Sequence, residues 1–384
     1  MAFPSFEGPQ NFYVHIPYCR NKCAYCPYNT KPLDETEVPA FYDVLLGEAR
    51  RVVEAGATAL GCSLYIGGGT PTCTGGALVR FIGDFVRCCS RPRTIAVETS
   101  ADELDMTNLA ALKNAGVTQL SVGVQSFDGG ILKRLGRSGN AERYESTLAL
   151  ASKAGFANLN VDLMYDADCE TLEEISSDLS HAIHSGADQI TIYPLFRFFR
   201  KDGVSMPSLR ARRSAFAFIW QRMVQEGFSP VSVWSFRKGG SGEAFSSVQR
   251  RSFVGLGPGA ATCHREFFAF NTFDTSAWMR RIAEGACAYS LEMPLSPNIR
   301  ALYSLYWDLY ACRMPKELDA GLKRRGVFRA LAKAGRILGL IKGEVLTERG
   351  AYWLHLLQNQ YMLDYINRVW SASRKLPFPP GIRL

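Results

Sequence analysis

The chain has 384 residues, of which 47% are hydrophobic and 21% are charged, and its formal net charge at pH 7 is +8. No apolar run reaches the length of a membrane-spanning helix, and Met1–Ser5 lacks a signal-peptide pattern, so a cytoplasmic location is expected. The basic residues are dispersed rather than gathered in one stripe, which argues against nucleic-acid binding. We therefore expect neither nucleic acid nor a membrane as a partner.

The cysteines divide into a cluster and a scattered set. Eleven is an odd number, and most of them lie far apart, which argues against a secreted disulfide framework. Cys19, Cys23 and Cys26 instead follow the extended run Phe12–Ile16 with the spacing C-x3-C-x2-C. A closed zinc site or iron–sulfur cluster takes four protein ligands. Three thiolates leave one metal position open, and an open iron is a place where chemistry can be done.

The first two thirds of the chain alternates strand-like and helix-like segments. The predicted strands are Phe12–Ile16, Ser63–Ile66, Thr94–Val97, Gln119–Val124, Asn158–Leu163 and Gln189–Pro194. The predicted helices between them are Val38–Ala55, Gly76–Cys88, Leu104–Ala115, Ala141–Ala154 and Leu172–Ser185. Six successive strand–helix units predict an α/β fold with a parallel sheet, either a partial barrel or a doubly wound sheet.

The pattern changes near residue 196. A long helix is predicted at Ser208–Glu226, and glycine-rich stretches follow at Lys238–Gly242 and Val254–Ala260. Helical periodicity returns from Asn298 and ends in Leu346–Gly350, which is typical of a small winged-helix-like unit. We predict a barrel core at 1–200, a barrel-closing and substrate-pocket extension at 201–295, and a C-terminal helical domain at 296–384.

Polar groups and glycines follow several predicted strands. Gly67–Thr72 comes after the second strand, Glu98 ends the third, Gln125 follows the fourth, and Asp162 lies on the fifth. Each has an ordinary explanation as a turn residue or a solvated rim group. In parallel α/β folds, however, functional groups gather at the carboxyl ends of the strands. Bare glycine amides approach ligands closely, and a carboxylate can hold a ribose diol, so the joint placement predicts a nucleotide-like site.

The ordered motifs resemble those of a known family. The three-cysteine loop, with Tyr25 before its last cysteine, resembles the radical S-adenosylmethionine (SAM) superfamily. The flanking motifs at 13–17, 67–72, 123–127 and 255–260 resemble its HemN-like subgroup, the oxygen-independent coproporphyrinogen III oxidase family. The resemblance extends from about residue 11 to about residue 355. It implies a partial (β/α)6 radical SAM barrel with a C-terminal α+β, winged-helix-like domain.

The resemblance also implies cofactors. A [4Fe-4S] cluster would be held by the three cysteines, and one SAM would bind its open iron; reduction would cleave that SAM to a 5′-deoxyadenosyl radical. The positions that resemble contacts to this SAM are Tyr13, Gly68 and Glu98, and Tyr25 stands within the cluster motif. The positions that resemble contacts to a second SAM, found in some members, are Gly69, Thr70, Gln125, Arg137 and Asp162. Phe196 and Ala261 fall where the family lines its pocket, whereas His15 is expected to be structural.

The chain departs from the family pattern at three places, and these departures bear on which function within the family is expected. Pro27-Tyr28-Asn29 stands where the coproporphyrinogen enzymes place a fourth cysteine. Phe245–Arg250 replaces the His-Asn-x-x-Tyr-Trp stretch of the haem-chaperone branch. Tyr165–Thr171 replaces the usual Tyr-Gly-Leu-Pro-Gly-Gln-Thr, so the turn there must take another shape.

Three functional hypotheses follow. The first is a class C methyltransferase or cyclopropanase, in which a second SAM donates a methyl or methylene group to an sp2 carbon. The second is porphyrinogen decarboxylation of the coproporphyrinogen oxidase type, or other tetrapyrrole chemistry. The third is a haem-binding chaperone on the same scaffold. All three expect a small-molecule partner, aromatic or unsaturated, with a tetrapyrrole as one option. The enzymatic two also need a reducing electron donor such as flavodoxin or ferredoxin.

Overall fold

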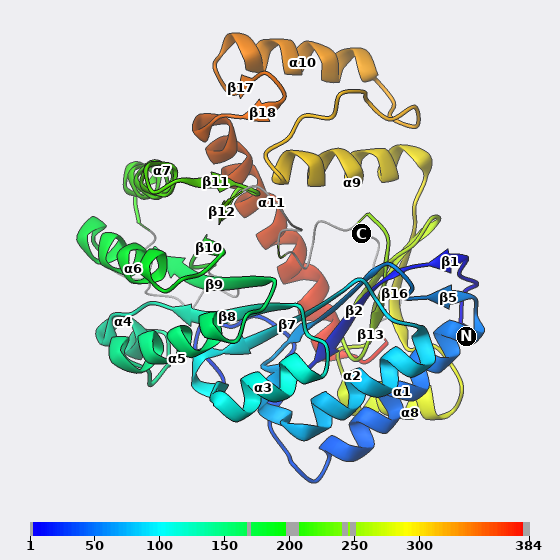
Figure 1. Cartoon of the computed structure of the whole chain (residues 1–384). Helices are drawn as coiled ribbons and strands as arrows, with labels where there is room; N and C mark the ends of the chain where they lie inside the picture. Colours follow the sequence, from blue (N-terminus) through cyan, green and yellow to red (C-terminus); the bar gives the residue numbers. More distant parts are fainter. Residues whose placement is uncertain (1–2, 167–169, 197–206, 240–244, 246–250, 379–384) are drawn as a thin grey trace.

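The computed structural model describes residues 3–166, 170–196, 207–239, 245 and 251–378. Its centre is a parallel sheet of six strands that are neighbours in the order of the chain (Figure 1). The strands are β2 (Asn11–Ile16), β6 (Ser63–Gly68), β7 (Thr94–Ser100), β8 (Gln119–Gln125), β9 (Asn158–Tyr165) and β10 (Gln189–Pro194). The six predicted strands are confirmed, and so is the parallel barrel-type arrangement.

Helices connect these strands and cover one side of the sheet. They are α1 (Val38–Glu54), α2 (Gly76–Cys89), α3 (Met106–Asn114), α5 (Ala141–Lys153) and α6 (Leu172–His184). α2 shows why they pack there, since Leu78, Phe81, Ile82 and Phe85 form one apolar stripe and are all buried. The short helix α4 (Gly129–Arg134), capped by Asp128, was not predicted from the sequence.

Antiparallel strands extend the sheet at both edges. Beyond β10 lie β12 (Ser235–Lys238) and β11 (Phe228–Pro230), which follow α7 (Leu209–Gln225). Beyond β2 lies β13 (Phe253–Leu256), parallel to it, and then β14 (Ala261–Cys263), β15 (Phe267–Asn271) and β16 (Tyr289–Pro294), with α8 (Thr275–Ala283). The described residues form a sheet of 12 strands, and those of the proposed 201–295 extension contribute to both of its edges.

Short strand pairs and a lobe complete the chain. β1 (Gly8–Pro9) pairs with β5 (Ala57–Thr58), and β3 (Tyr18–Cys19) pairs with β4 (Lys31–Pro32). The C-terminal lobe, at the top of Figure 1, contains α9 (Pro297–Tyr310), α10 (Arg325–Ile337), β17 (Ile341–Lys342), β18 (Val345–Leu346) and the start of α11 (Glu348–Lys375). α11 runs from this lobe to the barrel, where the Trp370 ring lies 5.9 Å from that of Tyr28. Among the described residues, no helix has the length and apolarity needed to cross a bilayer.

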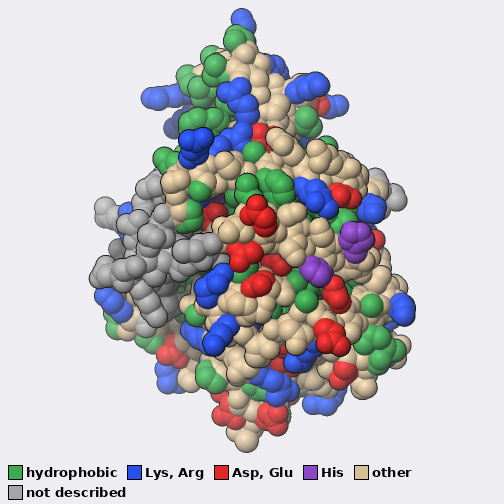
Figure 2. Space-filling view, turned by 90° about the vertical axis from the view of Figure 1, so that its left-hand side faces the viewer, with side chains coloured by type: hydrophobic (Ala, Val, Ile, Leu, Met, Phe, Trp, Pro, Cys, Tyr) green, Lys and Arg blue, Asp and Glu red, His purple; other side chains and the backbone are tan. Residues whose placement is uncertain are grey.

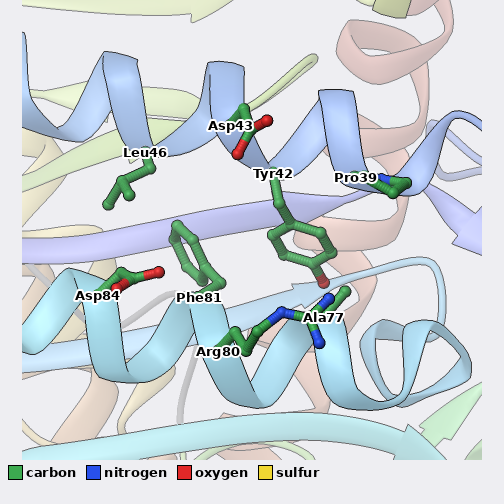
Figure 3. A pocket seen from close by; sticks show the side chains of 8 residues that line it. All are labelled: Pro39, Tyr42, Asp43, Leu46, Ala77, Arg80, Phe81 and Asp84. Atoms are coloured by element: carbon green, nitrogen blue, oxygen red, sulfur yellow. The ribbon is translucent and has the colours of Figure 1, made fainter.

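A small hollow of about 110 Å³ lies between α1 and α2 (Figure 3). Tyr42 and Phe81 lie across it from each other, beside Arg80 and Asp84. All of its lining residues come from these two helices, and none is a predicted site residue. The hollow is therefore a gap between packed helices rather than the site that the strand ends predict.

Candidate functional site

The three-cysteine loop is held at both of its ends. The amide of Leu33 donates to the carbonyl of Cys19 at 2.9 Å, and the amide of Lys31 donates to that of Pro17 at 2.8 Å. In the middle, the amide of Ala24 donates to the carbonyl of Leu135 at the end of α4. The backbone therefore presents the thiols from a fixed loop that is bound to the barrel.

The thiols are free, half-buried and close enough to influence one another. Burial raises the pKa of Cys26 to about 11, and the charges of Cys19 and Cys23 raise it further. Burial also raises the pKa of Cys19. Among the described residues, no three His, Cys, Asp or Glu side chains converge on a single ion. Three thiols on one loop fit an iron–sulfur cluster, in which each thiolate binds a different iron.

The glycine turn after β6 is shaped by close contacts on both sides. A Cβ on Gly69 would lie 2.9 Å from the Cys19 sulfur and 2.5 Å from the Tyr18 carbonyl oxygen. A Cβ on Gly67 would lie 2.5 Å from Glu98 Oε2, and Gly68 has a φ of +118°. The next residue, Thr70, lies with its hydroxyl 3.6 Å from the Cys19 sulfur. Only glycine fits these positions, so the turn brings bare backbone to the thiol loop.

Glu98 projects from β7 beside this turn. The Tyr65 hydroxyl donates to its Oε1, and the Gly68 amide donates to its Oε2 at 3.3 Å. Burial raises the pKa of Glu98 to about 7, and the charge of Asp162 adds to that shift. A carboxylate placed here can accept hydrogen bonds from a donor beside the glycine turn.

Tyr13 and His15 form a hydrogen-bonded pair on β2. His15 Nε2 lies 2.8 Å from the Asn29 carbonyl oxygen, so this nitrogen carries the proton and donates it. His15 Nδ1 then accepts from the Tyr13 hydroxyl at 3.0 Å. Burial lowers the pKa of His15 to about 4 and raises that of Tyr13. Both nitrogens of His15 are occupied within the chain, and its contact with Asn29 anchors the end of the cysteine loop.

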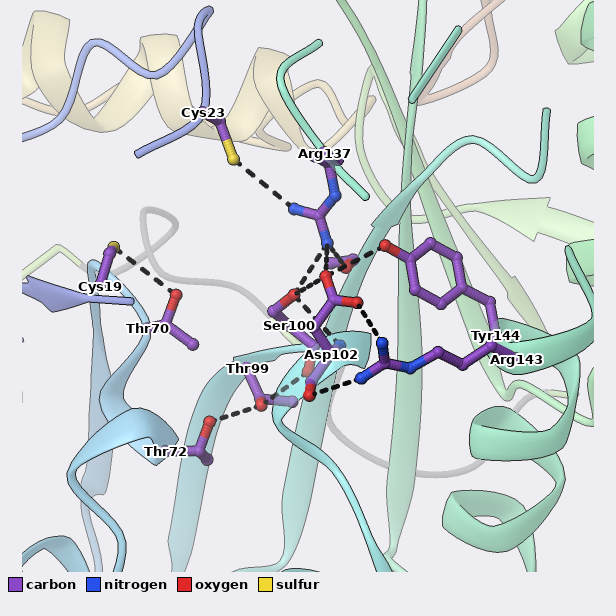
Figure 4. A network of polar contacts seen from close by, with 11 residues as sticks. Cys19, Cys23, Thr70, Thr72, Thr99, Ser100, Asp102, Arg137, Arg143 and Tyr144 are labelled. Atoms are coloured by element: carbon purple, nitrogen blue, oxygen red, sulfur yellow. Dashed lines mark hydrogen bonds and ion pairs between the residues drawn. The ribbon is translucent and has the colours of Figure 1, made fainter. Parts of the chain in front are cut away.

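Arg137 connects the cysteine loop to the ends of β7 and β8 (Figure 4). Its Nη2 donates to Ser100 Oγ at 2.8 Å and to the Gly123 carbonyl at 2.9 Å, while Nη1 lies 3.8 Å from the Cys23 sulfur. Asp102 receives both Arg137 and the Tyr144 hydroxyl, at 3.5 and 3.1 Å. Arg137 was predicted from the sequence, but Ser100, Asp102 and Tyr144 were not. The sequence feature that could have indicated them is the pair Ser100 and Asp102, which comes just after a predicted strand.

Hydrogen-bonded polar side chains link three strands in the barrel interior. Asp162 accepts from the Ser121 hydroxyl at 2.7 Å and from Asn160 Nδ2 at 2.8 Å, and Thr191 donates to Asn160 Oδ1 at 2.9 Å. Burial raises the pKa of Asp162 to about 6. Of this group only Asp162 was predicted. The alternation of Asn158, Asn160 and Asp162 along one strand was the missed signal, because alternate residues share a face of a sheet.

Gln125 ends β8 in an unusual backbone conformation. Its φ is +75°, and the pairing register with β9 shifts between Gly123 and Gln125. The Tyr193 hydroxyl donates to its side-chain oxygen at 2.7 Å. A non-glycine residue with positive φ at a strand end is strained, and such strain concentrates at functional sites.

The remaining predicted residues have neighbours outside these hydrogen-bonded groups. Tyr25 packs on the apolar cluster of Ile131, Leu135 and Met164. The Phe196 ring lies 5.2 Å from that of Trp234, and Ala261 begins β14. In the departure at Tyr165–Thr171, Asp166 has a φ of +65°, so the backbone there keeps a left-handed conformation at the position of the family's glycine. Residues 167–169 and 246–250 lie outside the described part of the chain.

Comparisons with known proteins agree with this geometry. Residues 13–181 match the family model described as the radical SAM superfamily. Over this segment the chain is similar to the radical SAM superfamily, and its sequence relatives are proteins of the HemN-like subgroup. The cofactors of this superfamily are a [4Fe-4S] cluster and SAM, and the half-buried thiols and the glycine turn against Cys19 fit them.

Sequence relatives include two kinds of named protein. The haem chaperone HemW of Bacillus subtilis is 26% identical over 65% of this chain and 69% of its own length. The oxygen-independent coproporphyrinogen III oxidase of Paracoccus denitrificans is 26% identical over 72% of this chain and 67% of its own. Several other haem chaperones align over only about half of their length, at 50 to 51%.

A solved structure supports the fold over the whole chain. The coproporphyrinogen III oxidase HemN of Escherichia coli superposes with a TM-score of 0.76 at 19% identity. The superposition covers 94% of this chain and 90% of HemN, so it includes the C-terminal lobe as well as the barrel.

Proposed function

We propose that this protein is a radical SAM enzyme that binds a tetrapyrrole. The observation that carries the proposal is the meeting of three groups at one end of the barrel: the thiol loop, the glycine turn of residues 67–69 and the Glu98 carboxylate. Cys19, Cys23 and Cys26 would hold a [4Fe-4S] cluster, which would supply the electron for reductive cleavage of SAM.

The chain's own residues would bind and orient the cofactors. Cys19, Cys23 and Cys26 would each hold one iron, and Arg137 would fix the position of Cys23 through its contact with that sulfur. Glu98 would accept hydrogen bonds from the ribose hydroxyls of SAM. That role fits its place beside the Gly68 amide, 3.3 Å away.

Other residues would restrict water around the site. Tyr25 and Tyr193 pack with Ile131, Leu135 and Met164 in an apolar cluster beside the polar interior. Burial raises the pKa of both tyrosines well above its ordinary value, so each hydroxyl keeps its proton and acts as a donor. A dry wall of this kind protects a reactive species from solvent.

The tetrapyrrole rests on the sequence relatives. Those named above are a haem chaperone and a coproporphyrinogen III oxidase, and neither is a methyltransferase. Haem binding therefore has more support than the methyl transfer that the sequence analysis favoured. The arginines suggested for substrate carboxylates contribute little to the argument, because Arg251 pairs with Asp308 at 2.5 Å and residues 197–201 lie outside the described part.

Methyl transfer from a second SAM is the second candidate. The strained backbone of Gln125 favours it, since strain at a strand end marks a functional position. Against it, Gln125 Oε1, Arg137 Nη2 and both carboxylate oxygens of Asp162 already have partners in the chain. A second SAM would have to displace some of those hydrogen bonds.

The decisive experiment is anaerobic reconstitution of the full chain with iron, sulfide, reductant and methyl-labelled SAM. Haem is titrated into one sample, and coproporphyrinogen III is added to another. We expect 5′-deoxyadenosine to form and a haem Soret band to saturate. Formation of S-adenosylhomocysteine, with the methyl label transferred to another molecule, would favour the methyl-transfer candidate, whereas loss of carbon dioxide from coproporphyrinogen III would identify decarboxylation. If no deoxyadenosine forms and haem does not bind, the proposal is wrong.

A further inference from the structure

α10 in the C-terminal lobe carries two surfaces that the fold does not use. Its basic residues, Arg325, Arg329, Lys333 and Arg336, lie within a sector of about 80° at the helical period, and the helix has no acidic residue. Beside this basic sector lies an apolar sector of about 120°. The apolar residues are Val327, Ala330, Leu331, Ala334, Ile337 and Leu338.

The apolar sector is open to solvent. Val327 is 53% exposed, Leu331 61%, Ile337 77% and Leu338 60%. Apolar stripes on the barrel helices are buried by contrast, as in α2. A continuous exposed apolar face beside a basic face indicates that this helix binds another surface.

A third side of α10 holds it to the lobe. Gly335 is the buried residue of this helix, and a Cβ there would lie 2.9 Å from Ile341 Cδ1 on β17. Phe328 and Ala332, which are half-buried, lie on the same side, so the helix is fixed by a face that adjoins its apolar sector. Its exposed faces can meet an external surface without any unfolding of the lobe.

The position of α10 makes both faces accessible to a large, flat partner. The lobe projects from the barrel in Figure 1, and Figure 2 shows hydrophobic and basic side chains together on this projection at the top of the view. Further cations, Lys323, Arg324 and Lys342, precede and follow the helix and are exposed. The neighbouring hairpin of β17 and β18 adds Val345, which is 51% exposed.

We propose that α10 docks the protein on a lipid bilayer that contains anionic lipids. The apolar sector enters the boundary between headgroups and acyl chains, and the four basic side chains contact the negative headgroups. A second copy of the chain is a poorer occupant, because it would bring two basic faces together. The proposal replaces the expectation of no membrane partner that the sequence suggested. It is compatible with the lack of a spanning helix among the described residues.

Vesicle flotation of the full chain tests the proposal. Phosphatidylcholine vesicles are compared with vesicles that also contain phosphatidylserine. We expect binding only with phosphatidylserine, and a loss of about five-fold in affinity for each basic residue that is removed. The basic variant carries Arg329→Gln with Lys333→Gln, and the apolar variant carries Val327→Asp with Leu331→Asp.

Matched controls remove side chains of similar exposure from the barrel. Met106→Asp on α3 controls for the apolar variant, because Met106 is 61% exposed. Arg91→Gln with Lys153→Gln controls for the basic variant, because both are exposed cations. Both α10 variants should lose binding while both controls retain it, with circular dichroism unchanged throughout.

Four outcomes would overturn the inference. They are absence of vesicle binding, equal binding to both vesicle types, equal loss in the controls, and loss in the basic variant alone. The last would indicate simple electrostatic adsorption without entry of the apolar face. If light scattering instead shows a dimer that Leu331→Asp dissociates, and vesicles do not bind, a second copy covers the helix and the bilayer proposal is wrong.

Discussion

The mouth of the barrel is the end where the thiol loop, the glycine turn and Glu98 meet. Polar side chains at this mouth and in the C-terminal lobe have opposite surroundings. At the mouth, Arg137 reaches Ser100, Gly123 and Cys23 at once, and these residues come from three different parts of the chain. In the lobe, the charges of α10 point to solvent beside exposed apolar side chains. One region is organised by contacts within the chain, and the other presents its groups outward.

This difference predicts where substitutions act. A change at the mouth disturbs several strands together, because each polar atom there is shared between elements. A change on the exposed faces of α10 leaves the chain's internal contacts intact. Substitutions at the mouth should therefore alter stability and cofactor binding, and those on α10 should alter association alone.

The largest effect is expected for Cys26→Ala. With two thiolates the loop cannot hold a four-iron cluster, so iron content and deoxyadenosine formation should both be abolished. Cys62→Ala is the matched control, because Cys62 is also half-buried but precedes β6 at the other end of the strand. Iron analysis and anaerobic SAM assays provide the measurements. A Cys26→Ala protein that keeps its full iron content would disprove the assignment of this loop.

Much of the barrel was predictable because its signals are local. The β-branched runs located the six strands of the barrel but not β13, and apolar periodicity placed helices such as α2 within a residue of their observed ends. α4 was missed because it is short and begins Gly129-Gly130, which predicts a turn rather than a helix.

The site was predictable only in part. The cysteines, the glycine turn and Glu98 follow strands directly, so the topology of a parallel sheet brings them together. The partners of Arg137 could not be found in this way, since Ser100 and Cys23 meet it from distant segments. The exposed apolar face of α10 was also missed, because periodicity predicts an apolar stripe without saying what covers it.

Gly257→Ala should be the most destabilising of the single substitutions near the mouth. Gly257 has a φ of +94°, and a Cβ there would lie 2.4 Å from the His15 carbonyl oxygen. We expect a loss of about 3 kcal/mol in the free energy of unfolding. Gly339→Ala is the control in the lobe, because its φ is +70° but nothing lies within 4 Å of the added carbon.

Urea unfolding compares the two glycine variants. The control should lose only about 1 kcal/mol, which is the cost of the left-handed backbone alone. Equal losses at both positions would mean that the contact with His15 contributes nothing.

Glu48→Gln should remove a pH dependence from the stability of the cluster-free protein. Glu48 is 2% exposed and accepts from the Gly257 amide, Trp278 Nε1 and Asn271 Nδ2. Burial raises its pKa from 4.5 to about 7. Because the folded pKa lies above the unfolded one, the stability it contributes is present below pH 4.5 and is lost as the pH rises through about 7.

The size of this pH effect follows from the difference between the folded and unfolded pKa of Glu48. A shift of this kind corresponds to roughly 3 kcal/mol between the two limits. The free energy of unfolding of Glu48→Gln should therefore improve relative to the parent as the pH rises across this range. A flat difference for Glu48→Gln would mean that this carboxyl is not desolvated.

Glu98→Gln tests the ligand side of the mouth. The amide can still accept from Tyr65, but it loses the charge that would hold a ribose diol beside the Gly68 amide. A hydrogen bond to a charged group contributes about 1.5–3 kcal/mol, so SAM affinity should fall by roughly ten- to hundred-fold. Equilibrium binding of SAM to reconstituted protein measures it, with Glu54→Gln as control. Unchanged affinity would remove Glu98 from the proposed SAM contacts.

The smallest effect is expected for Leu331→Asp on α10. This side chain is 61% exposed, so its replacement removes little internal packing. Deoxyadenosine formation in detergent-free solution should equal that of the parent, and the free energy of unfolding should change by less than about 0.5 kcal/mol. A marked loss of SAM cleavage would mean that the lobe and the barrel mouth are coupled, which would end the separation of roles between them.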